Sequence, residues 1–421
     1  MRALLIFVVA VSAAAHLHAQ ADSARLLARA RAIHRAIPMI DTHNDLPGAI
    51  REGSNNDLTL MNPDGPLPKV DTDIPRMKLG MVGGQFWAAY VPASLVKGGG
   101  ATYALEQIDV IHRMVAQSPS LAFARTAADI VRIHAQGKIA SLIGIEGGYA
   151  IENSLANIRM FADLGVRYMT LTHGGNTAWA DAATDAPAHG GLTRFGEEVV
   201  REMNRSGMMV DISHVSDGTM SDAIRVSDAP VIFSHSSARA VANHVRNVPD
   251  SILTLMKRNR GIVMVNIFPG FVNQIAAKQA AGALEKEREF MAKYPDDPKR
   301  ASAEYLAWLT NSMSTMESGT LNQVADHIDH IVQVAGIDHV GYGADFGELS
   351  NHPKGLEDVS RYPYLTAELL RRGYTEAQVG KIIGGNMLRV MREVERTAAR
   401  LQRSRAASVA RIEELDRAVR P

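Results

Sequence analysis

Short apolar runs alternate with amphipathic segments along most of the chain, and this alternation predicts its fold. The runs that predict strands lie near 37–42, 84–91, 140–145, 167–172, 207–212, 230–234, 261–267 and 339–343. Segments with apolar residues at helical spacing include 22–36, 103–117, 155–164 and 196–206. Strands that alternate with helices are typical of a parallel sheet, so the chain is predicted to be an α/β protein.

Eight strands favour a closed (β/α)8 TIM-like barrel over an open doubly wound sheet. An open sheet would usually carry a glycine-rich phosphate loop, and no G-x-G-x-x-G motif follows an early strand. A helical segment inserted near the seventh strand, at 274–320, interrupts the rhythm, with helices expected to 294 and over 303–316. It would either shape a pocket on the rim or form a passive surface hairpin. We also expect a long loop over 50–78 and an amphipathic helix over 375–402.

The two ends of the chain differ in composition from its middle. Arg2, a short apolar stretch and the Ala19-Gln20-Ala21 site predict a signal peptide over 1–21, cleaved after Ala19 or Ala21. An uncleaved membrane anchor is the alternative. Residues 22–402 then form the catalytic barrel domain and 403–421 a charged tail. We expect an exported, soluble protein, periplasmic or secreted, with no transmembrane span in the mature chain.

Charge and cysteine content narrow the choice of partners. The chain has 45 basic and 45 acidic residues, so no basic surplus indicates a nucleic-acid partner. It has no cysteine, which excludes disulfides and thiolate metal sites. Any metal would therefore bind to nitrogen and oxygen ligands.

Polar residues at the ends of the predicted strands are the candidates for such a site. The carboxyl ends of barrel strands meet at one rim, so residues distant in sequence converge there. His43 and Asp45 are two residues apart and can reach one ion. Glu146 ends another run, and its two oxygens can bridge two ions. His214 and His235 follow consecutive predicted strands.

Two further residues at strand ends have more than one reading. His173 could be a metal ligand or a hydrogen-bond donor to a developing oxyanion, and Asp345 a ligand or a general acid/base. Each could also have only a structural role. Together these residues favour metal-assisted hydrolysis, since two ions lower the pKa of a shared water and polarise a carbonyl or phosphoryl oxygen. His327 and His330, by contrast, are expected on a solvated helix face.

Several motifs resemble the membrane (renal) dipeptidase family, zinc peptidases of the amidohydrolase-like superfamily, over about 40–395. The motifs are Asp41–Pro47, Gly144–Gly148, Leu171–Asn176, Asp211–Ser216, Ser234–Ala238, Arg246–Asp250 and Gly355–Val359. The resemblance implies two zinc ions: His43 and Asp45 bind one, His214 and His235 bind the other, and Glu146 bridges them.

The same resemblance implies how the remaining site residues act. His173 would contact the scissile carbonyl oxygen, Asp345 would transfer protons, and Arg246 would bind the free carboxylate of the substrate. The expected reaction is hydrolysis of dipeptides with a free C-terminal carboxylate by attack of a metal-bridging hydroxide. A barrel metallohydrolase of N-acyl amino acids, lactams or phosphoesters is the alternative, and a binding protein with a degenerate site is a third reading. Relatives are often homodimers, but no interface can be read from the sequence.

Overall fold

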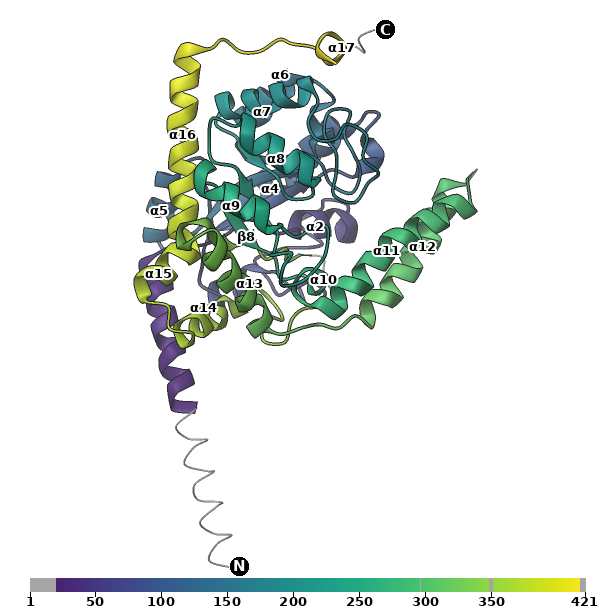
Figure 1. Cartoon of the computed structure of the whole chain (residues 1–421). Helices are drawn as coiled ribbons and strands as arrows, with labels where there is room; N and C mark the ends of the chain where they lie inside the picture. Colours follow the sequence, from purple (N-terminus) through teal and green to yellow (C-terminus); the bar gives the residue numbers. More distant parts are fainter. Residues whose placement is uncertain (1–19, 296, 348–350, 417–421) are drawn as a thin grey trace, which may run out of the picture.

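Eight parallel strands close into a barrel in the computed structural model, which describes residues 20–295, 297–347 and 351–416 (Figure 1). The barrel strands are β1 (Met39–Asp41), β2 (Val82–Tyr90), β4 (Ile139–Glu146), β5 (Val166–Thr170), β6 (Met209–Asp211), β7 (Ile232–Phe233), β8 (Ile262–Val265) and β9 (Val340–Tyr342). Pairing of β1 with β9 and of β2 with β4 completes the ring. The predicted (β/α)8 barrel is confirmed, with each strand at its predicted place.

A ninth strand, β3 (Leu121–Phe123), pairs only with the start of β4 and was not predicted. Three residues are too few to produce a recognisable alternation. Helices cover the outside of the barrel: residues 20–36, α2 (Leu46–Ser54), α3 (Ile74–Leu79), α4 (Gly100–Gln117), α5 (Ala127–Ala135), α6 (Leu155–Leu164), α7 (Arg194–Ser206), α8 (Asp217–Val226), α9 (Asp250–Asn259), α10 (Pro269–Val272), α13 (Leu321–Val334) and α14 (Tyr362–Arg371). Four short 3-10 turns lie between them, at Ala93–Leu95 (η1), Gly148–Ile151 (η2), Ile337–His339 (η3) and Val359–Arg361 (η4).

The predicted long loop at 50–78 is partly wrong, because α2 covers its beginning and α3 its end. The α2 helix has a proline in its first turn and buries its apolar face, including Ile50. The α3 helix begins at Asp73, whose side chain accepts a hydrogen bond from the backbone N–H of Arg76. These short helices could not be recognised in the sequence because most of their surroundings are polar. A few buried apolar residues are enough to hold each helix against the barrel.

The predicted helix at 375–402 is interrupted by a π turn. It consists of α15 (Glu376–Gly380), the π segment η5 (Lys381–Gly385) and α16 (Asn386–Ser404). A Cβ on Gly384 would lie 2.0 Å from the carbonyl oxygen of Pro38, so only glycine lets this turn pack against the chain before β1. The long α16 then runs along one side of the barrel (Figure 1).

The segment after β8 forms a helical hairpin of α11 (Gln274–Lys293) and α12 (Pro298–Ser314). In Figure 1 the hairpin projects from the barrel, with its base beside α10. It follows the seventh strand of the ring, so its base lies at the carboxyl-end rim. His327 on α13 is buried rather than solvated, which corrects the expectation from sequence. Its Nδ1 accepts a hydrogen bond from the N–H of Ala238, and its Nε2 donates to the carbonyl of Val272.

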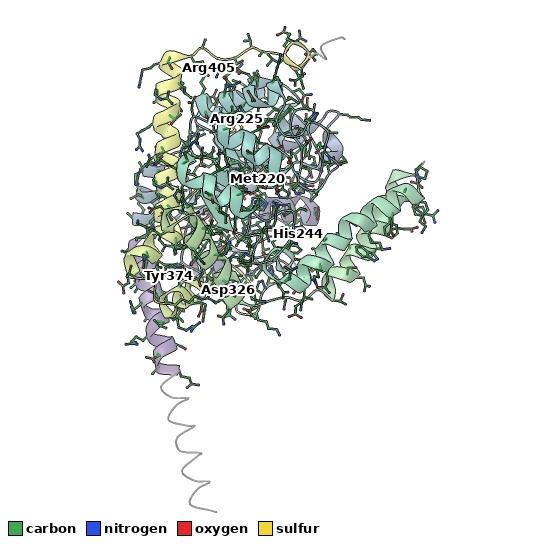
Figure 2. All side chains as sticks on the ribbon, in the orientation of Figure 1. Met220, Arg225, His244, Asp326, Tyr374 and Arg405 are labelled. Carbon is green, nitrogen blue, oxygen red and sulfur yellow. The ribbon has the colours of Figure 1, made fainter. Side chains whose placement is uncertain are left out.

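Figure 2 shows Arg405 where the chain leaves α16 and turns towards its end. This segment returns to α7, because Asp416 accepts hydrogen bonds from the Thr193 hydroxyl and the Phe195 N–H. It includes the short helix α17 (Ile412–Leu415). Most of the expected signal peptide, residues 1–19, lies outside the described residues, as does 417–421 of the expected tail. Across the described ranges, no helix has the length and apolar character that a bilayer crossing requires.

Candidate metal centre and substrate pocket

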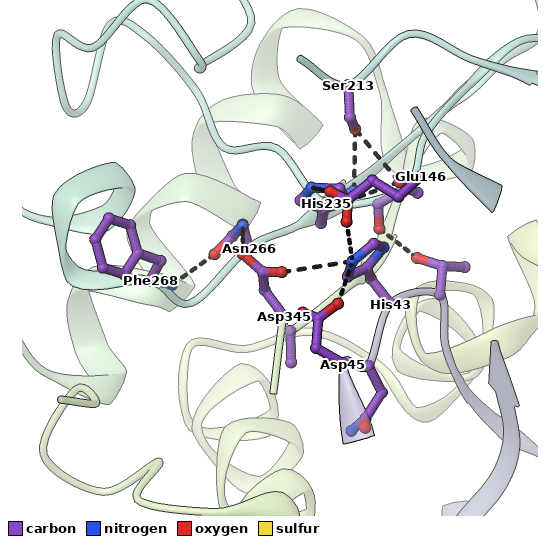
Figure 3. Close-up of polar contacts among 12 residues, drawn as sticks. His43, Asp45, Glu146, Ser213, His235, Asn266, Phe268 and Asp345 are labelled. Atoms are coloured by element: carbon purple, nitrogen blue, oxygen red, sulfur yellow. Dashed lines mark hydrogen bonds and ion pairs between the residues drawn. The ribbon is translucent and has the colours of Figure 1, made fainter. Parts of the chain in front are cut away.

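Five side chains from the ends of four strands lie together at the mouth of the barrel, and Figure 3 shows four of them, His43, Asp45, Glu146 and His235. The Nε2 atom of His43 lies 3.3 Å from Oδ1 of Asp45 and 3.5 Å from Oε2 of Glu146. On the opposite side, Nε2 atoms of His214 and His235 lie 3.0 and 3.3 Å from Oε1 of Glu146. The residues predicted as metal ligands are therefore brought together.

Glu146 lies between the two halves of this cluster. Its Oε2 faces His43, while its Oε1 faces His214 and His235. Burial raises the pKa of Glu146, but the neighbouring His43 and His173 and the hydrogen bonds from His214 and His235 all lower it, and the pKa lies well below its ordinary value. An ionised carboxylate with one oxygen towards each half has the geometry that a bridging ligand requires.

The ring of His43 is held by Tyr168, a residue that the sequence did not single out. The Tyr168 hydroxyl donates to the carbonyl of Thr42, over 3.0 Å, and lies 2.9 Å from Nδ1 of His43. Because its proton is engaged with Thr42, the phenol oxygen accepts the Nδ1–H proton of His43. In its neutral form, which is the form that binds a metal, His43 then carries its lone pair on Nε2, which is buried and has no hydrogen-bond partner.

His235 is oriented in the same way, by the side chains of Ser234 and Asp211. Ser234 donates its hydroxyl proton to Oδ2 of Asp211 over 2.5 Å, and its oxygen lies 2.8 Å from Nδ1 of His235. The Ser234 oxygen therefore accepts the Nδ1–H of His235, and in the neutral ring Nε2 carries no proton and points into the cluster. This Nε2 lies only 2.7 Å from Nε2 of His214. Nitrogens converging in this way are typical of ligands around a cation.

The other two predicted catalytic residues lie next to this cluster. Oδ1 of Asp345 is 3.7 Å from Nε2 of His43, and its Oδ2 accepts a hydrogen bond from Asn266 over 2.8 Å. Nε2 of His173 lies 3.7 Å from Oε1 of Glu146. Burial lowers the pKa of His173, although Glu146 opposes this effect, so its imidazole is neutral at neutral pH.

Arg246 is a buried cation beside the cluster. Its guanidinium contacts the hydroxyl of Ser236 and the carbonyl of His235, and its Nε has no hydrogen-bond partner. No carboxylate of the described residues lies within salt-bridge distance of it. Burial lowers the pKa of Arg246 to about 10, so the group stays charged at neutral pH. A buried charge without a counter-ion is costly, and a ligand carboxylate would supply one.

Arg246 and the cluster share one cavity of about 550 Å³. Phe268 and Phe271 from the α10 segment form part of its wall, and Phe271 lies under the Arg246 guanidinium. The hairpin contributes further wall residues, namely Gln279, Ala280, Ala283, Leu309 and Ser312. His244, another wall residue, is labelled in Figure 2 where the hairpin meets the barrel. A larger depression of about 710 Å³, between α8, α9 and α16, holds none of the candidate residues.

The profile described as membrane dipeptidase (peptidase family M19) matches residues 27–405. The chain belongs to the membrane dipeptidase family. It is 42% identical over 376 residues to dipeptidase 3 of Rattus norvegicus and 41% identical to that of Mus musculus. Each match covers 88% of this chain and about two thirds of the relative, 68% and 67%. As a member of this family the chain is a hydrolase, a metallopeptidase, and the resemblance found in the sequence is confirmed.

Solved structures of similar proteins agree with this membership. The probable dipeptidase PvdM from Pseudomonas aeruginosa superposes with a TM-score of 0.76 at 26% identity, covering 89% of this chain and 99% of that one. A metallopeptidase from Rhodobacter sphaeroides, liganded with a phosphinate mimic of the dipeptide L-Ala-D-Ala, gives a TM-score of 0.67, also at 26% identity. That match covers 85% of this chain and 99% of the other.

The metal that the membrane dipeptidase family implies fits the residues present. The His, Asp and Glu side chains form three overlapping groups of three, and within each group the ligand atoms lie within 4.8 Å of one another. His43 belongs to two of these groups, and so does Glu146. Imidazole nitrogens and carboxylate oxygens suit zinc and similar divalent ions. The orphaned, buried Nε2 of His43 would gain the partner that it otherwise lacks.

Sequence reasoning missed the residues that hold these ligands in place. Tyr168, Asp211 and Ser234 each lie in or beside a predicted strand, but none was recognised as part of the site. Asp41 is another, since its buried carboxylate accepts hydrogen bonds from the N–H groups of His43 and Ala344. A usable signal was present: an aspartate that ends a buried strand two or three residues before a histidine.

Proposed function

We propose that this membrane dipeptidase homologue hydrolyses dipeptides that carry a free C-terminal carboxylate, using two zinc ions. His43 and Asp45 would hold one ion, His214 and His235 the other, with Glu146 between them. The ions would supply a hydroxide nucleophile at neutral pH and polarise the peptide carbonyl. The observation that carries the proposal is Arg246, a buried cation that has no carboxylate partner among the described residues and lies in the same cavity as candidate ligands.

The residues of the chain would bind and orient the substrate in three places. Arg246 binds the carboxylate through charge-assisted hydrogen bonds, which places the peptide bond over the ligand cluster. Its neighbour Phe271 packs beneath the guanidinium and limits where that carboxylate can lie. The neutral imidazole of His173 donates a hydrogen bond to the carbonyl oxygen as negative charge develops there.

Asp345 would transfer the protons of the reaction. Asn266 engages one of its oxygens, which leaves the other facing His43 and the cluster. From this position Asp345 accepts the proton of the attacking water and delivers it to the departing amine. One carboxylate can act first as base and then as acid because the leaving amine is the stronger base.

The decisive experiment compares a dipeptide with its C-terminal amide in wild-type protein and in Arg246→Gln. Wild-type protein should hydrolyse the dipeptide with a far higher kcat/KM than the amide. In Arg246→Gln, kcat/KM for the dipeptide should fall about 10²-fold, since charged hydrogen bonds contribute about 1.5–3 kcal/mol, and the preference over the amide should largely disappear. Equal rates for dipeptide and amide in the wild type would refute the proposal.

Arg225→Gln is the matched control for that experiment. Arg225 is exposed on α8 and pairs with Glu197 at 2.8 Å and Asp222 at 2.9 Å, outside the cavity. Its substitution should leave the preference for the dipeptide unchanged. N-acyl amino acids, which also carry the carboxylate, belong in the same panel. If they are hydrolysed faster than dipeptides, the chain is an acylase that binds its substrate in the same way.

We further propose that residues 1–21 direct export and are then removed. The charge, short apolar stretch and small residues of this segment support the proposal. N-terminal sequencing of the full-length protein, expressed in a secretion-competent host, should begin at Gln20 or Asp22. Recovery of an intact N-terminus in the membrane fraction would instead indicate an anchor.

A further inference from the structure

Several side chains hold the loop that carries His173. Thr184 donates to the carbonyl of Gly174 and Asp185 accepts from the N–H of Asn176, whereas the N–H of His173 itself is bound by Tyr149. Residues 171–176 follow β5 without helical or strand structure. The buried hydroxyl of Tyr149 accepts hydrogen bonds from the backbone N–H of His173 over 3.1 Å and of Gly175 over 3.2 Å. It also donates to the carbonyl of Gly175. One phenol therefore uses its donor and both lone pairs on this loop.

Tyr149 is itself attached firmly to the strand that ends in Glu146. It lies in η2, which begins two residues after Glu146. Between them, Gly147 has a φ of 113°, a left-handed conformation that favours glycine. A Cβ on Gly148 would lie 2.4 Å from the carbonyl oxygen of Leu171, so the two segments touch backbone to backbone. The segment after the Glu146 strand and the His173 loop are thus packed directly against each other.

We propose that Tyr149 is a positioning residue that fixes the imidazole of His173 over the substrate carbonyl. The inference rests on the role proposed for His173 above and extends it to a residue outside the cavity wall. Burial raises the pKa of Tyr149 to about 12, so the hydroxyl keeps its proton and remains a donor at neutral pH. Nothing in the described structure gives Tyr149 a direct contact with the metal-ligand atoms.

The expected effect follows from the three lost hydrogen bonds. In Tyr149→Phe the ring still fills its buried site, but two loop N–H groups and one carbonyl lose their partner. The loop would then sample other positions, and a displacement of about 1 Å at a reacting group can cost about 10²-fold in rate. We expect kcat to fall about 10- to 100-fold, with KM changed less than about threefold, because His173 acts mainly in the transition state.

A double-mutant cycle with His173→Ala tests the inference. If Tyr149 acts through His173, Tyr149→Phe lowers kcat in the wild type but has little further effect in His173→Ala. Effects that multiply would overturn the inference, as would an unchanged kcat in Tyr149→Phe. If His173→Ala itself leaves kcat unchanged, the proposed role of His173 is wrong, which is a separate result. Metal content should remain at the wild-type value in all three variants.

Amide hydrogen exchange gives a readout that does not depend on activity. The amides of His173 and Gly175 should exchange faster in Tyr149→Phe, because each has lost its acceptor. Tyr342→Phe is the matched control: Tyr342 is also buried in the barrel, and its hydroxyl lies 3.4 Å from Thr366, away from the loop. It should change neither exchange at the loop nor kcat. Unchanged protection of both amides in Tyr149→Phe would refute the positioning role.

Discussion

Replacing Tyr168 by phenylalanine should weaken metal binding without altering any candidate ligand. The substitution removes the hydroxyl that accepts from Nδ1 of His43 and donates to Thr42. The ring should remain in place, since it packs so closely on β4 that a Cβ on Gly144 would lie 2.0 Å from its Cζ. The variant therefore isolates one hydrogen-bonding group beneath the site.

The magnitude follows from the groups that are left unsatisfied. Both Nδ1 of His43 and the carbonyl of Thr42 belong to residues with no exposed surface, so water cannot easily replace the phenol. A buried polar group without its partner costs about 1–3 kcal/mol. Without the phenol, the His43 tautomer that has its lone pair on Nε2 is no longer favoured over the tautomer that has its lone pair on Nδ1. Loss of such a supporting partner typically lowers metal affinity about 10- to 100-fold.

Competition against a chelator of known affinity measures this loss directly. Elemental analysis at each chelator concentration should show one metal equivalent leaving Tyr168→Phe at a lower concentration than wild type. The second equivalent, nearer His214 and His235, should be affected less. Tyr342→Phe again serves as the control and should titrate like wild type. Identical titrations of Tyr168→Phe and wild type would refute the reasoning that Tyr168 orients His43.

Three further predictions concern the chemistry and the stability of the fold. Asp345→Asn should lower kcat about 10²- to 10⁴-fold while metal content stays unchanged, and wild-type turnover would remove its role as proton carrier. Dialysis against a chelator should abolish hydrolysis and added zinc should restore it; activity that survives with no bound metal would contradict metal dependence. Burial lowers the pKa of His327 to about 4 from an ordinary 6.5. At this residue the unfolded chain therefore binds more protons between these values, and the contribution of His327 to the free energy of unfolding should fall by about 3 kcal/mol as pH drops from 6.5 to 4, at about 1.4 kcal/mol per pH unit. Denaturant titrations should give His327→Gln a shallower pH slope, and parallel curves for variant and wild type would count against the assignment.

The barrel could be predicted from sequence because its strands are buried on both faces. Continuous apolar runs such as 140–145 stand out from the amphipathic helices between them, and β4 is buried along its whole length. The short elements could not be predicted in this way. Helix α2 was hidden by polar residues, and β3 was too short for any period. The break at η5 depends on how closely Gly384 approaches Pro38, which is a tertiary contact.

The candidate metal ligands could be predicted for a related reason, whereas the residues that hold them in place could not. A barrel brings all strand ends to one rim, so His43, Glu146 and His235 could be expected to meet before any coordinates were known. Arg246 was found only through resemblance to a family, because burial of a lone arginine leaves no local signal. Tyr168 and Tyr149 look like ordinary core residues in the sequence. Their hydroxyl contacts depend on packing between distant segments.

Two aspartates, each at the end of a strand, support the two halves of the candidate metal site through the same hydrogen-bond arrangement. Asp41 ends β1 and accepts hydrogen bonds from the N–H groups of His43 and of Ala344, which follows the neighbouring β9. Asp211 ends β6 and accepts from the N–H groups of Ser213 and of Ser234, which follows the neighbouring β7. Each aspartate thus ties the turn that carries a ligand to the next strand. Both are fully buried and bonded to neutral donors, so a change to asparagine, which keeps one acceptor oxygen, should loosen the turn more than it unfolds the barrel. Both variants should bind metal more weakly, while the thermal stability of the metal-free protein should be nearly unchanged. Equal losses in stability and in metal affinity would contradict the inference that these aspartates mainly hold the ligand turns.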